Sequence, residues 1–239
     1  MTDIQTHQNK QSTDSKSIIA FTGIQRFCHK HTIHFILLLA VTGLPVLSHA
    51  FSCIAYLFAV PYDFVSHQDN VILADGIMVV RMLHRVLAFL FILMLIPFLI
   101  AMLVKIRSWQ IWPEQGWKPQ YIVEGIRQLF IAYIRFESPN TGKYNMGQKL
   151  MAWTIMLTTG VMVISGFILM FRDIFSPELQ VYARAGHAIG FVLLMIMLVA
   201  HCYFALFPTN RKGLTAMFGD GKLSKLYVRQ HHKLWYKKL

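Results

Sequence analysis

The stretch that decides the fold is residues 185–210, which read AGHAIGFVLLMIMLVAHCYFALFPTN. Its 26 residues include no Asp, Glu, Lys or Arg, and most of them are apolar. A helix that crosses a membrane needs about 20 apolar residues, so this stretch predicts one membrane span. Three further windows lack the same four residue types: residues 31–62, 86–104 and 150–171. We therefore expect an all-α fold, a bundle of four transmembrane helices.

The composition and the distribution of charge favour the same class of protein. The 239 residues are 55% hydrophobic and only 14% charged, whereas about 25% of the residues in soluble domains are charged. The net charge of +12 is compatible with basic membrane loops or with a surface that binds nucleic acid. Nineteen of the 23 Lys and Arg residues precede the first span, lie between the second and third, or follow the fourth. The positive-inside rule then predicts cytoplasmic termini in the inner membrane.

This distribution makes the positive charge a signal of topology, so we expect no nucleic-acid partner. The basic cytoplasmic surface instead suits anionic lipids. Along the chain we expect a polar tail over residues 1–23, disordered over 1–17. A membrane domain over residues 24–210 and a basic cytoplasmic tail over residues 211–239 follow.

The first charge-free window is longer than one span. Pro45 and Pro61 interrupt it, so we place the span near residues 30–49. The rest, residues 50–62, is expected to form an interfacial aromatic segment outside the bilayer. The alternative interpretation is a signal peptide, because Ser48-His49-Ala50 resembles a cleavage site. However, the polar lead of about 30 residues is longer than the N-terminal region of a signal peptide.

Two histidines on the decisive stretch indicate its chemistry. His187 and His201 are 14 residues apart, which on an α-helix is a rise of about 21 Å with both side chains near one face. They are too far apart to share a single metal ion. Two haems, one near each membrane boundary and each held by histidines from two helices, fit this spacing. The chain has no CxxCH motif, so covalently attached haem is not indicated.

Each haem needs a second histidine at the same depth in the membrane. His84 lies at the outer start of the second span, and we pair it with His187 as ligands of the outer haem. The candidates to pair with His201 at the inner haem share the cytoplasmic start of the first span: His29, His31 and His34. Gly43 comes 14 residues after His29 and would let a flat macrocycle approach the backbone, which favours His29.

The alternative for any of these histidines is a hydrogen bond between helices. We prefer this alternative for the three that the pairing leaves over: His31, His34 and His49. A histidine inside a membrane is costly and usually functional. Four histidines at two matching depths favour haem binding.

Several segments carry a resemblance to a known family. They are Arg26-Phe-Cys-His29, Met82-Leu-His84, Gly142-Lys-Tyr-Asn-Met-Gly-Gln-Lys149, the helix with His187 and His201, Gly221-Lys-Leu-Ser224 and His231-His-Lys-Leu-Trp-Tyr236. From about residue 24 to its end the chain resembles the cytochrome b (gamma) subunit of respiratory formate dehydrogenase, within the wider di-haem membrane cytochrome b family.

The resemblance implies a cytochrome with two haems b that takes electrons from an outward-facing iron–sulfur subunit and reduces menaquinone on the cytoplasmic side. The implied haem iron ligands are the four paired histidines: His29, His84, His187 and His201. The implied quinone site is Asn145, Gly147 and Gln148, ahead of the third span. For Asn145 and Gln148, capping that helix is the alternative role.

The resemblance also implies that the substrate is oxidised in another chain, a catalytic subunit with molybdenum or tungsten. No residue of this chain is an evident nucleophile or hydrolytic base. Other functions remain open: the equivalent cytochrome b of a hydrogenase or another molybdopterin oxidoreductase, or a haem-bearing anchor without quinone chemistry. A transporter with a histidine proton relay would need acidic residues inside the spans, and the four windows contain none.

Overall fold

The protein is described by a computed structural model that covers residues 17–66, 72–106, 109–113, 116, 118–135 and 141–239. The predicted disorder of the N-terminal lead lies outside the described residues, except for Ser17, which begins a strand. Within the described residues, the chain divides into two compact units. The terminal unit holds residues 1–26, 105–162 and 192–239, and the hairpin unit holds residues 27–104 and 163–191.

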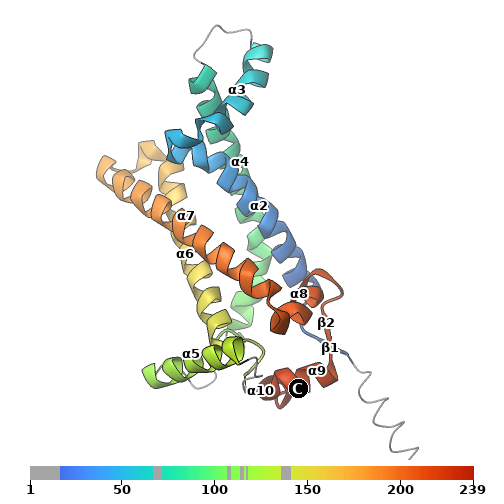
Figure 1. The fold of residues 1–239 in the computed structure, drawn as a ribbon. Helices are drawn as coiled ribbons and strands as arrows, with labels where there is room; N and C mark the ends of the chain where they lie inside the picture. The colour runs from blue at the N-terminus through green and yellow to red at the C-terminus, as the bar shows by residue number, and fades with distance from the viewer. Residues whose placement is uncertain (1–16, 67–71, 107–108, 114–115, 117, 136–140) are drawn as a thin grey trace, which may run out of the picture. The chain divides into compact units, whose positions relative to one another are not determined.

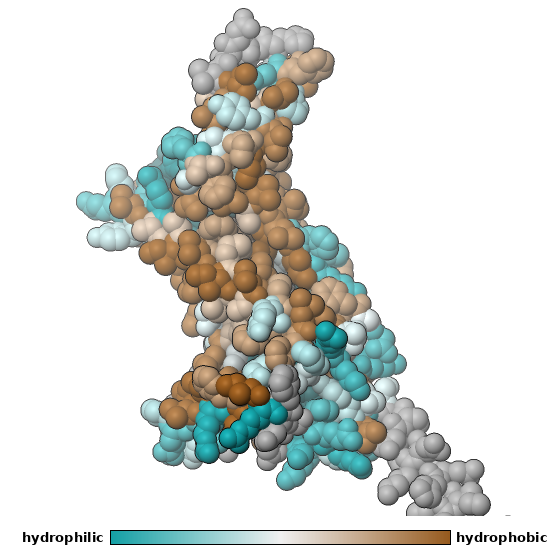
Figure 2. Space-filling model, in the orientation of Figure 1, coloured by the Kyte–Doolittle hydropathy of each residue, from teal (hydrophilic) through white to brown (hydrophobic). Residues whose placement is uncertain are grey.

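Four long helices dominate the described chain (Figure 1): α2 (Gly23–Leu47), α4 (Ile72–Val104), α6 (Met146–Met170) and α7 (Pro177–Leu206). Each is long and apolar enough to cross a membrane, as the charge-free windows predicted. Few of their apolar side chains are buried, and Figure 2 shows a brown surface over these helices. An apolar surface of this kind is typical of helices that face lipid.

The remaining elements are short: β1 (Ser17–Ile19), η1 (His49–Phe51), α3 (Ser52–Ser66), α5 (Pro119–Ile134), η3 (Arg172–Ile174), η4 (Pro208–Asn210), α8 (Arg211–Phe218), β2 (Lys222–Ser224), α9 (Lys225–His231) and α10 (Lys233–Tyr236).

Each long helix begins before the charge-free window that predicted it. The prediction put His84 at the start of its helix, but α4 begins 12 residues earlier, at Ile72. A helix satisfies its own backbone hydrogen bonds and can continue into water, so the first charged residue marks the end of the apolar stretch and not the end of the helix. At about 1.5 Å per residue, the 33 residues of α4 span roughly 50 Å, which exceeds a hydrocarbon core of about 30 Å.

In the hairpin unit, α3 packs tightly on the start of α4. Ala55, Ala59 and Val80 are fully buried, and a Cβ added at Gly76 would lie 2.3 Å from the Ala55 carbonyl oxygen. The absence of a side chain at this glycine therefore allows the two backbones to meet. The prolines do not interrupt helices as predicted, because Pro45 lies inside α2 and Pro61 lies inside α3. The first span was placed near residues 30–49, and α2 ends at Leu47.

In the terminal unit the two ends of the chain meet. β1 pairs with β2 in antiparallel register, with Ile18 opposite Leu223. Beside the pair lies a small buried core of Ala20, Ala216, Leu223, Tyr227, Val228 and Trp235. The prediction gave two separate tails, over residues 1–23 and 211–239, because neither stretch of sequence specifies a partner strand. Their pairing is a property of the tertiary structure.

Candidate functional site

Two of the predicted histidines meet in the hairpin unit. His84 on α4 and His187 on α7 have ring centroids 6.3 Å apart, and their ring planes are inclined by 74°. Bonds between a metal and an imidazole nitrogen are about 2 Å long. A single metal atom placed between the two rings is therefore within reach of both.

A buried hydroxyl group holds the His84 ring. Thr42 Oγ1 on α2 lies 3.0 Å from His84 Nδ1 and donates to the Leu38 carbonyl at 2.8 Å. Because the hydroxyl hydrogen is used on that carbonyl, the oxygen accepts a hydrogen bond from His84 Nδ1–H. In a neutral imidazole the other nitrogen, Nε2, then carries the lone pair that can bind a metal.

A second hydroxyl group lies beside the other histidine. Ser165 Oγ on α6 is buried and lies 3.0 Å from His187 Nδ1. The residue after each hydroxyl is a glycine, and a Cβ added at Gly43 or at Gly166 would lie 3.2 or 3.3 Å from the nearest histidine Cε1. The Nδ1–Cε1 edge of each ring therefore lies against a hydroxyl group and the adjacent glycine backbone of one helix. The prediction gave Gly43 to a macrocycle, and the structure places the His84 ring against it.

The other predicted histidines are described one by one. His29 on α2 is half-buried in the hairpin unit, and His201 on α7 is half-buried in the terminal unit. Their pairing stays a prediction. His31 is exposed and contacts Phe27 at 4.2 Å between ring centroids. His34 and His49 are also exposed, and His34 Nδ1 lies 2.9 Å from the carbonyl oxygen four residues earlier in its helix.

The predicted quinone segment forms the start of α6. Asn145 Oδ1 accepts a hydrogen bond from Gln148 N at 2.9 Å, and Gln148 Oε1 accepts one from Asn145 N at 3.0 Å. These reciprocal bonds form a capping box, which was the alternative role for both residues. Gly147 admits a neighbouring helix, because a Cβ there would lie 2.9 Å from Leu129 Cδ1.

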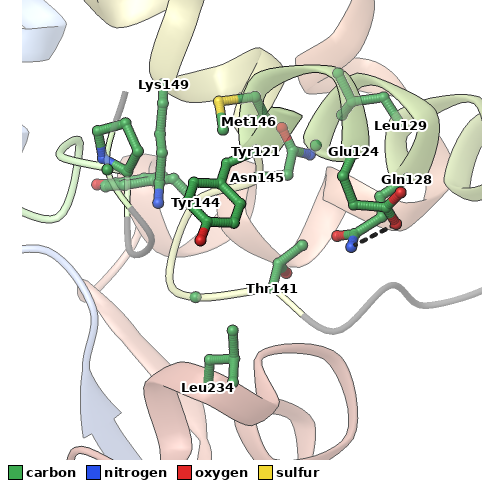
Figure 3. Close-up of a pocket in the computed structure, with 14 residues that line it drawn as sticks. Tyr121, Glu124, Gln128, Leu129, Thr141, Tyr144, Asn145, Met146, Lys149 and Leu234 are labelled. Carbon is green, nitrogen blue, oxygen red and sulfur yellow. Dashed lines mark hydrogen bonds between the residues drawn. The ribbon is translucent and has the colours of Figure 1, made fainter. Parts of the chain in front are cut away.

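An open pocket lies beside this cap, between α5, the start of α6 and the C-terminal tail (Figure 3). Asn145 lines the pocket, whereas Gln148 and Gly147 are not among its lining residues. Figure 3 shows Tyr144 and Lys149 on one side and Glu124 on the other. The remaining lining residues are Pro113, Gly116, Tyr121, Gly125, Gln128, Leu129, Thr141, Gly142, Met146 and Leu234. The pocket offers hydrogen-bonding groups next to an apolar wall.

A buried lysine borders this pocket. The Lys149 side chain is only 1% exposed, and its Nζ donates to the Trp112 carbonyl at 3.2 Å. The Trp112 and Trp153 rings contact each other with centroids 4.9 Å apart and planes inclined by 54°, so indole rings cover this end of α6. Burial also raises the pKa of the neighbouring Tyr144 to about 12. Its hydroxyl, like that of any tyrosine at neutral pH, is protonated and able to donate.

Comparison with known proteins identifies the family. Residues 20–220 match the family described as prokaryotic cytochrome b561. The chain belongs to this cytochrome family. Members bind haem of the b type, and the resemblance to formate dehydrogenase cytochrome subunits seen in the sequence is confirmed by the relatives of this cytochrome.

These relatives are named as cytochrome b556 subunits of formate dehydrogenase. The cytochrome is 24% identical over 229 residues to the formate dehydrogenase cytochrome b556(fdo) subunit of Escherichia coli strain K12, and the match covers 93% of each chain. It is 31% identical over 103 residues to the nitrate-inducible cytochrome b556(Fdn) subunit of that strain, where the match covers 42% of the cytochrome and 46% of the relative. A cytochrome b556 subunit of formate dehydrogenase from Haemophilus influenzae is 32% identical over 103 residues, or 41% of each chain.

The residues present in the hairpin unit fit a b-type haem. Among the described residues of the cytochrome, no three His, Cys, Asp or Glu side chains gather as a metal site would require. Two facing imidazoles suit a metal whose remaining ligands come from a macrocycle. The glycines beside His84 and His187 let helix backbone approach both rings, where a Cβ would lie 3.2 or 3.3 Å from Cε1.

Sequence reasoning missed the two hydroxyl groups and the buried lysine of this cytochrome. A signal for the first was present: Thr42-Gly43 and Ser165-Gly166 repeat a hydroxyl–glycine pair inside two apolar helices. Lys149 was counted only as a loop charge, because no sequence pattern tells a buried lysine from a solvated one.

Proposed function

We propose that this cytochrome is the membrane subunit of a respiratory oxidoreductase complex of the formate dehydrogenase type. It would take electrons from an outward-facing iron–sulfur subunit and deliver them to menaquinone at the cytoplasmic side of the inner membrane, with both termini cytoplasmic. Two haems b, when bound, supply the one-electron chemistry between these ends. The observation that carries the proposal is the facing pair His84 and His187, each held by its own hydroxyl group.

At the outer haem, His84 and His187 would bind the iron through Nε2. Thr42 Oγ1 accepts from His84 Nδ1–H, and Ser165 Oγ lies 3.0 Å from His187 Nδ1, so a hydroxyl contact orients each ring. Partners of this kind also increase the basicity of a ligating imidazole. For the inner haem the proposed ligands are the half-buried His29 and His201.

At the quinone site, Asn145 would contact the quinone from the lining of the pocket. Gln148 would act indirectly, because its side chain holds the Asn145 backbone, and Gly147 would let Leu129 close one wall. A quinone carbonyl accepts hydrogen bonds, and the protonated Tyr144 hydroxyl can donate one.

The proposed partners follow from the names of the relatives, which are subunits of formate dehydrogenases. The cytochrome would assemble with the iron–sulfur subunit and with a catalytic subunit that holds molybdenum or tungsten. The oxidation of the substrate would take place in that catalytic subunit. The proteins that co-purify with the cytochrome, identified by mass spectrometry, test this assembly.

Haem content tests the proposed ligands. The purified cytochrome should show a reduced α-band of haem b and two haems per chain. His84→Ala and His187→Ala should each retain one haem, and the retained haem should have the same spectrum in both. His31→Ala is the control and should retain two. A native protein without an α-band would contradict the proposal, and full haem content in either His84→Ala or His187→Ala would contradict the outer ligand assignment.

A further inference from the structure

Helix α5 carries an exposed apolar stripe that the proposed function does not use. Val123, Ile126, Phe130 and Ile134 have exposed fractions between 38% and 67%. Their spacings of three, four and four residues put them within an arc of about 80° on the helix. Four neighbouring apolar side chains on one arc form an exposed apolar patch, and such patches commonly mark sites of contact with a protein or a membrane.

The adjacent face of α5 is packed, and it fixes where the helix lies in the terminal unit. A Cβ added at Gly125 would lie 2.8 Å from the Met146 side chain, at the start of α6. Tyr133 contacts Phe204 and Phe207, near the end of α7, with ring centroids 5.1 and 5.0 Å apart. Asn210 Nδ2 also donates to the Tyr133 hydroxyl at 3.0 Å. Helix α5 is therefore packed against the ends of two spanning helices. The ends of spanning helices lie at the level of a membrane surface.

The third face of α5 is polar. Glu124 and Arg127 form an ion pair at 3.4 Å, and the Arg127 side chain is 72% exposed. Lys118 precedes the helix as its N-cap residue. Figure 2 shows apolar and hydrophilic side chains on different sides of α5, with the apolar side turned toward the spanning part of α6. A helix with these two sides suits the boundary between water and hydrocarbon.

We propose that α5 is an interfacial helix whose stripe, Val123 to Ile134, lies among the acyl chains of the membrane boundary. Arg127 and Lys118 then contact the phosphates of anionic headgroups. The occupant is lipid because the stripe begins where the spanning helices end and because basic side chains flank it. A second copy of the chain, or another subunit, would be a different occupant and is an outcome of the test.

Photo-crosslinking in native membranes identifies what touches the stripe. The photoreactive residue p-benzoylphenylalanine replaces Phe130 in one variant, Ile134 in a second and Arg135 in a third. Arg135 is exposed and lies on the polar side, so it is the matched control. We expect lipid adducts by mass spectrometry at 130 and 134, and at least tenfold fewer at 135. The size-exclusion profile of each purified variant, compared with that of the native chain, shows whether it folds.

Other adducts would overturn the proposal. Crosslinks from 130 or 134 to peptides of a second copy or another subunit would assign the stripe to a protein. Equal lipid yields at all three positions, or no lipid adducts at 130 and 134, would contradict insertion. Because Ile134 is the last residue of α5, its variant remains informative if the Phe130 variant does not fold. None of these outcomes depends on haem or quinone chemistry.

A mixed membrane tests the headgroup contact. In nanodiscs with equal phosphatidylglycerol and phosphatidylcholine, adducts at position 130 should be enriched in phosphatidylglycerol. Arg127→Gln should lower that enrichment by up to about fivefold, since one basic residue near an anionic surface contributes about 1 kcal/mol. An enrichment that Arg127→Gln leaves unchanged would overturn the headgroup contact.

Discussion

The Thr42 hydroxyl oxygen lies 3.0 Å from His84 Nδ1 while its hydrogen is donated to the Leu38 carbonyl. The direction of one hydrogen bond is thus set by another within the same helix. Ser165 Oγ lies at the same distance, 3.0 Å, from His187 Nδ1. At His84, a side chain that would touch no metal therefore decides which imidazole nitrogen is available to one.

Thr42→Val should therefore raise the midpoint potential of the outer haem. Without an acceptor at Nδ1 the imidazole becomes a poorer donor to iron, and the oxidised state loses more stability than the reduced one. The shift should be at most about 60 mV, the equivalent of one net hydrogen bond. A redox titration followed at the α-band measures it. Thr42→Ser keeps the hydroxyl and should keep the potential; equal shifts in the two variants would show that packing is responsible.

Gly43→Ala and Gly166→Ala should reduce the occupancy of the outer haem. Each new Cβ would lie within 3.3 Å of a histidine Cε1, so the ring must move by a few tenths of an ångström. Gly160→Ala on α6 is the matched control, because a Cβ there meets nothing within 4 Å. Haem per chain, measured as the pyridine complex, should fall in the first two variants only. A similar loss in Gly160→Ala would indicate a general effect on the helix.

Substitutions at Asn145 can separate the cap from the quinone. Asn145→Ala removes the acceptor of the Gln148 N–H bond and should cost about 1 kcal/mol of stability. Asn145→Asp keeps an oxygen for the cap but replaces the amide donor with a carboxylate. Both variants should lose haem reduction by a menaquinol analogue, and only the alanine variant should melt earlier. Normal reduction in Asn145→Asp would remove this residue from the quinone site.

The stability of the terminal unit should increase with pH because of the buried Lys143. Its Nζ lies 5.0, 5.2 and 5.5 Å from the ring centres of Phe21, Tyr144 and Trp235 and donates to the Ala20 carbonyl. Burial lowers the pKa of Lys143 to about 8, against about 10.4 for an unfolded lysine. Between these values the unfolded chain binds more protons, so stability increases with pH.

Thermal unfolding followed by tryptophan fluorescence measures this effect. Between pH 7.5 and 9.5 the melting temperature of the native chain should rise relative to that of Lys143→Met, which has no charge to lose. The window ends before tyrosine ionises, at about pH 10 in an unfolded chain. Parallel curves for the two proteins would mean that Lys143 does not titrate in this range.

The four spans could be predicted from local composition, and the placement of His187 and His201 on one long helix could be predicted from the same charge-free stretch. The start of α4 could not be predicted, because the charge-free window begins only after Arg85 whereas the helix begins at Ile72. Helix α5 was not predicted at all, since a stretch with both charges and apolar residues fits a loop equally well. The Thr42 and Ser165 contacts depend on how separate helices face each other, which no single stretch of sequence specifies.

The pairing of β1 with β2 also constrains the order of events during synthesis. Ile19 leaves the ribosome long before its partner Lys222 exists. The terminal unit cannot close until all four long helices have been made, and a chain that stops early leaves β1 without its partner strand. Exposure of the first strand would thus label an unfinished cytochrome, and closure of the strand pair would mark one whose four long helices have all been made.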